Sequence, residues 1–178
     1  ALAACPADGP VHFVTHSMGG ILLRRYLADN ALPRLGRTVM LAPPNQGTEV
    51  VDRLRDMPGF ALWNGPTGLE LGTGPGSVPN RLGPFPGELG IIAGSRSFNP
   101  LLSWLVPGPD DGKVAVPRTA VAGMDDFIVL PRTHTFMMSA APVIRQTLHF
   151  LAHGRFDRGR GEHGYSAGGH SDGGRSDG

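Results

Sequence analysis

The feature that most constrains the fold is a short apolar strand pattern that leads into a helical pattern with almost no linker. Val11 to Thr15 is typical of a short buried strand, and a helical pattern begins at Met18 and runs to Asn30. A second apolar strand pattern, Arg37 to Ala42, follows this helix. A strand, a helix and another strand within about thirty residues predict a βαβ unit with parallel strands.

The same patterns predict further strands and helices downstream. Strands are expected at Leu89 to Ala93 and at Phe127 to Leu130. Thr48 is a suitable cap for a short helix that ends at Arg55, while Ser139 and Pro142 mark the start of a last helix. The sequence therefore predicts an α/β fold, with a mostly parallel sheet flanked by helices.

Helical spacing also predicts which faces of the two long helices are buried. For the first helix, the expected buried residues are Ile21, Leu22, Leu23, Tyr26 and Leu27, with Arg24, Arg25 and Asp29 facing water. For the last helix, the expected buried residues are Val143, Ile144, Thr147, Leu148 and Leu151.

Composition excludes several classes of function. The 178 residues suit one domain, and no apolar run is long enough to span a membrane. Sixteen basic and 15 acidic residues give a net charge of +1, too small a basic field to hold nucleic acid. The lone cysteine, Cys5, excludes an internal disulfide and a thiolate metal cluster. This cysteine count and the absence of a signal-peptide pattern are compatible with a soluble protein of the reducing cytoplasm.

The segment Val14 to Gly20 places a serine between the first strand and the first helix. Such a tight turn needs small residues near Ser17, so that strand and helix can pass closely, and it presents the hydroxyl at the carboxyl edge of the sheet. The helix N-terminus beneath it favours an oxyanion, to which the backbone N–H of Met18 is the candidate donor.

The run His16-Ser17-Met18-Gly19-Gly20 resembles the nucleophile elbow of α/β-hydrolases, in particular that of bacterial lipases and esterases. It differs from the pattern G-x-S-x-G at the first glycine, where Thr15 stands. A surface serine at the start of an ordinary helix is the competing interpretation, and the strand in front with paired glycines behind favours the elbow. Neighbours on such a turn point apart, so we expect His16 to pack or line the site.

The resemblance implies a chain order of Ser, then an acid, then His, with the His after the last strand. His134 follows the strand pattern Phe127 to Leu130 and precedes the last helix, where this order requires the base. Three other histidines are less suitable because they lie in the first strand or in the last helix: His12, His149 and His153.

The acid has several candidates. In the lipases that this chain resembles, the acid commonly stands before a Gly-x-Val step, and Asp111 matches that pattern. Asp110 is the alternative acid, followed by Asp125 and Asp126. The unused member of the adjacent pair would be an ordinary turn aspartate.

The family also takes a second oxyanion donor from a loop upstream of the elbow, and nothing before Val11 matches that loop. We therefore expect residues 1–153 to be the C-terminal portion of an α/β-hydrolase domain whose first strands are missing. Residues 154–178 are rich in glycine and polar residues and are expected to form a disordered tail.

Together these patterns predict a serine carboxylic-ester hydrolase of the esterase or lipase kind, acting on a small-molecule ester or lipid through an acyl-enzyme on Ser17. No cofactor, metal or nucleic acid is expected. Gly59 to Gly90 is either an apolar lid or acyl pocket, with Phe60, Leu62, Trp63, Leu69 and Leu71, or a plain surface loop. Two alternatives stay open: an acyltransferase using the same residues, and a catalytically incompetent fragment with only a binding role.

Overall fold

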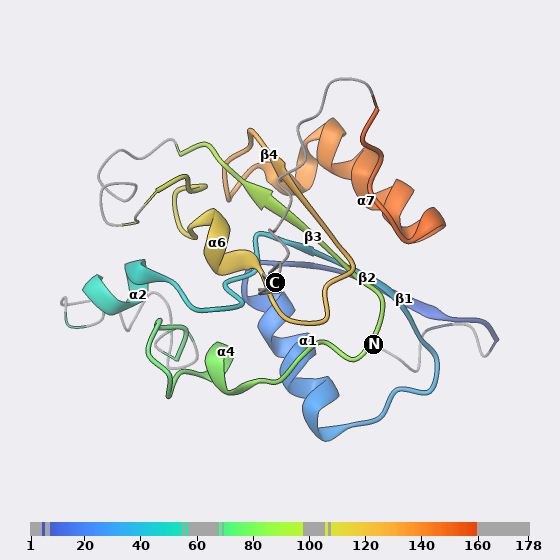
Figure 1. The fold of residues 1–178 in the computed structure, drawn as a ribbon, viewed down its shortest axis with the longest axis horizontal. Helices are drawn as coiled ribbons and strands as arrows, with labels where there is room; N and C mark the ends of the chain where they lie inside the picture. Colours follow the sequence, from blue (N-terminus) through green and yellow to red (C-terminus); the bar gives the residue numbers. More distant parts are fainter. Residues whose placement is uncertain are drawn as a thin grey trace, which may run out of the picture.

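The chain forms a four-stranded parallel sheet in a computed structural model that describes residues 5, 8–54, 56, 68, 70–97, 106 and 108–159. The strand order follows the sequence (Figure 1). The strands are β1 (Val11–His16), β2 (Leu35–Leu41), β3 (Leu89–Gly94) and β4 (Asp126–Leu130). This arrangement, with helices against the sheet, confirms the predicted α/β fold.

Two long helices cover the sheet, one on each face (Figure 1). The helices are α1 (Met18–Asp29), α2 (Glu49–Leu54), α4 (Val78–Arg81), α6 (Val116–Thr119), the 3-10 helix η2 (Met137–Ser139) and α7 (Ala141–His153). Within the described part of the chain, no helix combines the length and the apolar character that crossing a membrane requires.

The core lies on both faces of the sheet because side chains alternate along each strand. In β2, Val39 and Leu41 join a buried cluster with Phe150 of α7. Met40, between them, faces the opposite way and packs in a cluster with Leu23 of α1. Strands buried on both faces need continuous apolar runs, and β3 is buried along its whole length. The expectation of a buried strand is wrong for β1, where Val14 is 51% exposed.

The predicted buried face of α1 is wrong at several positions. Arg24 is only 4% exposed, although we expected it to face water. Leu22, expected to be buried, is 51% exposed, and Tyr26 is also exposed. The reason is that α1 packs against the sheet on one side and against α4 and the loop after it on another, where carbonyl groups accept hydrogen bonds from Arg24.

The predicted buried face of α7 is right at Val143 and Thr147 and wrong at two positions. Ile144 and Leu148 are exposed, the latter by 62%, whereas Gln146 and Phe150 are buried. Phe150 faces the core, and Gln146 faces the chain that follows α7, where its amide donates a hydrogen bond to the carbonyl of Asp157 at 2.7 Å. The tertiary partners of the helix therefore decide its buried face.

The chain remains packed beyond the end of α7. Phe156 is buried in the core, with its ring centroid 5.0 Å from that of Phe150. Arg158 forms an ion pair with Asp126 at the start of β4. Packing thus extends past the expected boundary at His153, and residues 160–178 of the expected tail lie outside the described residues.

The expected lid region is described only in part. Residues 57–67 and 69, which include Phe60, Leu62 and Trp63, lie outside the described residues. Leu71 is buried in a small cluster with Ile21 and Val51, so this part of the region packs on α1 and α2.

Candidate active site

Ser17 occupies a sharp bend between the end of β1 and the start of α1. Its backbone has φ 55° and ψ −128°, a conformation that residues with a side chain rarely adopt. Holding a residue there costs about 1–3 kcal/mol, which the surrounding structure has to offset. Part of this support is a hydrogen bond from the Ser17 amide to the carbonyl of Leu41 in β2, at 2.9 Å.

The close passage of strand and helix depends on Gly20 more than on Gly19. A Cβ atom on Gly20 would lie 3.0 Å from Sδ of Met40 and 3.2 Å from Cβ of Pro43. A Cβ atom on Gly19 would make only an ordinary contact, 3.5 Å from Cβ of Thr15. Thr15 therefore fits where the family pattern has glycine, whereas a side chain at Gly20 would press on Met40 and Pro43.

The strain at Ser17 gives a stability prediction. We expect the free energy of unfolding of Ser17→Gly to exceed that of Ser17→Ala by about 1 kcal/mol. The reason is that only glycine adopts this conformation without a penalty from Cβ. Both variants lack the hydroxyl, so chemical denaturation of the pair isolates the backbone effect. Equal free energies of unfolding would show that the bend is not strained.

The structure brings Ser17, His134 and Asp111 into one chain of hydrogen bonds. Oγ of Ser17 lies 2.9 Å from Nε2 of His134, and Nδ1 of His134 lies 2.8 Å from Oδ2 of Asp111. The side chains of His134 and Asp111 are buried. Buried, aligned groups of this kind pass a proton from hydroxyl to imidazole and leave the resulting imidazolium beside a carboxylate.

The turn at Asp111 fixes its carboxylate. Oδ1 accepts hydrogen bonds from the amides of Lys113 at 3.0 Å and Val114 at 2.9 Å, which leaves Oδ2 for His134. Gly112 has φ +100°, a conformation that suits glycine and closes this tight turn. The Gly-x-Val step noted in the sequence therefore corresponds to a turn that holds the acid in place.

The carboxylates of the other acid candidates bind backbone amides or an arginine. Oδ1 of Asp110 accepts a hydrogen bond from the amide of Gly112 at 2.6 Å. Asp125 accepts one from the amide of Leu89 at 2.7 Å, and Asp126 pairs with Arg158. The carboxylate that meets the imidazole is thus the one from Asp111.

The remaining described histidines make their contacts away from Ser17, with one exception. Nδ1 of His12 accepts a hydrogen bond from the amide of Arg37, and the ring of His149 binds the carbonyl of Arg155. His153 stacks against His149 near the end of α7. The exception is His16, which reaches the predicted base.

His16 contacts His134 through both its ring and its hydrogen bond. Nε2 of His16 lies 3.0 Å from the carbonyl oxygen of His134, and the two ring centroids are 4.8 Å apart. Burial, and secondarily the neighbouring His134, lower the pKa of His16 below its ordinary value. The sequence predicted a packing or lining role for His16, but the partner lies 118 positions away and no local pattern indicates it.

Arg24 lies two turns after Ser17 on α1 and ties the helix to two loops. Its guanidinium donates hydrogen bonds to the backbone and side-chain oxygens of Asn45, at 3.0 and 3.1 Å. It also donates to the carbonyls of Pro79, Leu82 and Gly83. Burial lowers the pKa of Arg24 to about 10, so the group stays charged at neutral pH and is held by oxygen dipoles.

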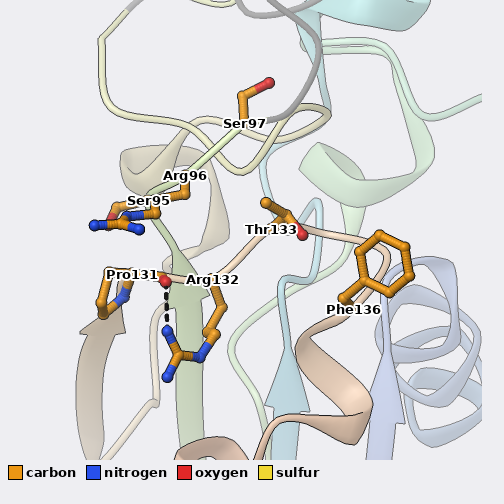
Figure 2. A pocket seen from close by; sticks show the side chains of 7 residues that line it. All are labelled: Ser95, Arg96, Ser97, Pro131, Arg132, Thr133 and Phe136. Atoms are coloured by element: carbon orange, nitrogen blue, oxygen red, sulfur yellow. Dashed lines mark hydrogen bonds between the residues drawn. The ribbon is translucent and has the colours of Figure 1, made fainter.

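A groove of about 680 Å³ opens beside the loop that carries His134 (Figure 2). Thr133, the residue before His134, lies in its wall, and Phe136 presents an apolar ring that is 60% exposed. The other lining residues follow β3 and β4: Ser95, Arg96, Ser97, Pro131 and Arg132. The groove thus combines apolar surface with two guanidinium groups at the carboxyl edge of the sheet.

Solved structures with this fold include a bacterial lipase. The mature form of the lipase BlEst2 from Bacillus licheniformis matches with a TM-score of 0.60 and 20% identity, over 81% of this chain and 65% of the lipase chain. The propeptide form matches with a TM-score of 0.55 and 21% identity, over 71% of this chain and 32% of the other. This chain therefore spans less than two thirds of the length of these lipase chains.

Comparison with protein families and with curated protein sequences finds no match. The likeness to the lipase establishes a shared α/β fold.

Proposed function

We propose that this chain carries the nucleophile, base and acid of a serine ester hydrolase. The observation that carries the proposal is the chain of hydrogen bonds from Ser17 through His134 to Asp111, with distances of 2.9 and 2.8 Å. A serine hydroxyl is a poor nucleophile until a base accepts its proton, and an imidazole oriented by a carboxylate is suited to that task. The shared fold with a bacterial lipase supports the same chemistry.

The reaction proceeds in two acyl-transfer steps. Oγ of Ser17 attacks the ester carbonyl while Nε2 of His134 accepts the hydroxyl proton, giving a tetrahedral oxyanion. Collapse of this intermediate breaks the bond to the alcohol, which leaves with the proton from His134 and an acyl group on Ser17. Water then attacks the acyl-enzyme, again with His134 as base, and releases the carboxylic acid and free serine.

The oxyanion is stabilised from the start of α1. Met18 is the first residue of this helix, so no residue within the helix accepts a hydrogen bond from its backbone N–H. This N–H lies directly behind the nucleophile, at the positive end of the helix dipole. One donor of this kind contributes about 3 kcal/mol to stabilising the transition state.

The groove beside the His134 loop supplies contacts for the part of the ester remote from the carbonyl. The ring of Phe136 and the side chain of Pro131 offer apolar surface for an acyl or alcohol chain. Most small-molecule sites are concave and largely apolar with a few polar groups, and this groove fits that description. The substrate class is accordingly a small ester or a lipid.

Covalent labelling tests the proposed function directly. A fluorophosphonate probe reacts with an activated serine, and we expect it to modify Ser17, as shown by mass spectrometry of the digested chain. Hydrolysis of p-nitrophenyl esters, followed with and without an added alcohol acceptor, separates a hydrolase from an acyltransferase. Labelling at another serine, or equal labelling of Ser17→Ala, would contradict the assignment.

The adjacent aspartates allow a matched test of the acid. We expect Asp111→Asn to lower kcat about 10⁴-fold, because an amide does not orient the imidazole or stabilise the imidazolium as a carboxylate does. Asp110→Asn keeps an oxygen that can accept the hydrogen bond from Gly112 and should change kcat less than threefold, about 0.7 kcal/mol or less in barrier. Steady-state kinetics on one ester compares the two, and similar losses in both variants would exclude Asp111 as the single acid.

A further inference from the structure

We propose that His16 is a positioning residue that holds the catalytic base against the nucleophile through a hydrogen bond from its ring to the backbone carbonyl of His134. This inference rests on the proposed function, since it assigns a role in the same reaction. Its basis is the 3.0 Å separation between Nε2 of His16 and the carbonyl oxygen of His134. His16 directly precedes Ser17, so one hydrogen bond connects the nucleophile bend to the base loop.

All the polar groups of His134 are engaged. Its backbone amide donates to the carbonyl of Asp111 at 2.9 Å, and its ring bonds Asp111 on one side and Ser17 on the other. The bond from His16 to the carbonyl is the fourth. The acid therefore holds His134 from one side, and the residue beside the nucleophile holds it from the other.

The chemistry of the pair fixes the tautomer of His16. A carbonyl oxygen only accepts hydrogen bonds, so Nε2 of His16 has to carry a proton. In the neutral ring, Nδ1 then carries none. Rings with centroids 4.8 Å apart and planes tilted by 49° also make van der Waals contact, so the ring of His16 restricts movement of the His134 loop in addition to its hydrogen bond.

The charge state of His16 matters because His134 becomes a cation during the reaction. The charged or titratable groups that act on His16 are His134, Asp111 and Lys113. Burial and His134 lower the pKa of His16, which keeps its ring neutral at neutral pH. A protonated His16 would lie beside the imidazolium and oppose its formation, because like charges at this separation repel.

Three substitutions separate the hydrogen bond from the ring. His16→Phe keeps a ring and loses the donor, whereas the side-chain amide of His16→Gln places an N–H close to the position of Nε2. His149→Phe is the matched control, because this histidine also binds a backbone carbonyl, at 2.8 Å, and lies far along the chain in α7. Folding of each variant is checked by its melting temperature.

We expect His16→Phe to lower kcat about 10- to 100-fold with KM within about twofold, since misplacing a reacting group slows the chemical step. His16→Gln should recover most of this loss, and His149→Phe should match the unsubstituted chain. Equal losses in the Phe and Gln variants, or a kcat for His16→Phe within twofold of the unsubstituted chain, would overturn the proposal.

The pH profile gives a readout that a purely structural role would not move. Because protonation of His16 opposes the imidazolium, the acid limb of log kcat/KM should fall more steeply in the unsubstituted chain than in His16→Gln. Identical slopes in the two proteins would contradict the role of a neutral His16.

Nuclear magnetic resonance separates this inference from the proposed function. Nitrogen-15 shifts of labelled histidine should show His16 as the neutral Nε2–H tautomer in the unsubstituted chain at pH 7. The Nδ1–H tautomer would overturn the inference even in a chain that the fluorophosphonate labels. Failure of that probe to label a chain with the Nε2–H tautomer would instead refute the proposed function.

Discussion

Ser17→Ala is expected to lower kcat for ester hydrolysis by about 10⁴- to 10⁶-fold. The variant keeps the fold, the base and the acid, and loses only the oxygen that attacks the carbonyl. Residual activity comes from substrate binding and from stabilisation of the oxyanion. A water molecule then attacks the carbonyl in place of Ser17. Burst kinetics with a p-nitrophenyl ester should lose their initial phase, because no acyl-enzyme forms.

Ser77→Ala is the control for this experiment. Ser77 precedes α4, where its hydroxyl accepts a hydrogen bond from Asn80, and it lies outside the described groove and hydrogen-bonded chain. Its substitution should leave kcat unchanged. A Ser17→Ala variant that retains more than about one tenth of kcat, a barrier change under 1.4 kcal/mol, would mean that another group attacks the ester.

Arg24→Met should lower the free energy of unfolding by about 3 kcal/mol. Methionine replaces much of the buried volume, but the oxygens of Asn45, Pro79, Leu82 and Gly83 lose their donor. Leaving buried acceptors without hydrogen bonds costs about 1–3 kcal/mol each where water cannot replace the donor. For a chain of this size the melting temperature should fall by roughly 6–12 °C.

The neighbouring Arg25 provides the matched control. It is exposed and forms an i,i+4 ion pair with Asp29 at 3.1 Å. Exposed pairs of this type contribute about 0.3–0.5 kcal/mol, so Arg25→Met should change the melting temperature by no more than about 2 °C. Comparable losses in the two variants would show that the guanidinium of Arg24 does not hold the loops to α1.

The sequence predicts the sheet well because each strand contains a short apolar stretch. The expected strand Val11 to Thr15 differs from β1 by one residue, and Leu89 to Ala93 differs from β3 by one. Helices α4 and α6 were not predicted, since four residues are too few to show a helical period. A helical period also leaves open which neighbours a helix meets, as the buried Arg24 illustrates.

The sequence also predicts part of the candidate site. The resemblance to the nucleophile elbow, with the chain order that it implies, indicated Ser17 and His134. The Gly-x-Val step favoured Asp111 over the adjacent Asp110, and the turn geometry shows which carboxylate meets the imidazole. The hydrogen bond from His16 to His134 joins the end of β1 to the loop after β4, which is distant in sequence. Contacts of this kind depend on how the strands are placed side by side, which no local pattern encodes.

The three residues of the hydrogen-bonded chain stand behind three different strands: Ser17 follows β1, Asp111 lies between β3 and β4, and His134 follows β4. Ser17 and His134 are 117 positions apart along the chain. No short stretch of this polypeptide can therefore form the arrangement by itself. The three side chains meet only once the sheet has brought these strand ends together.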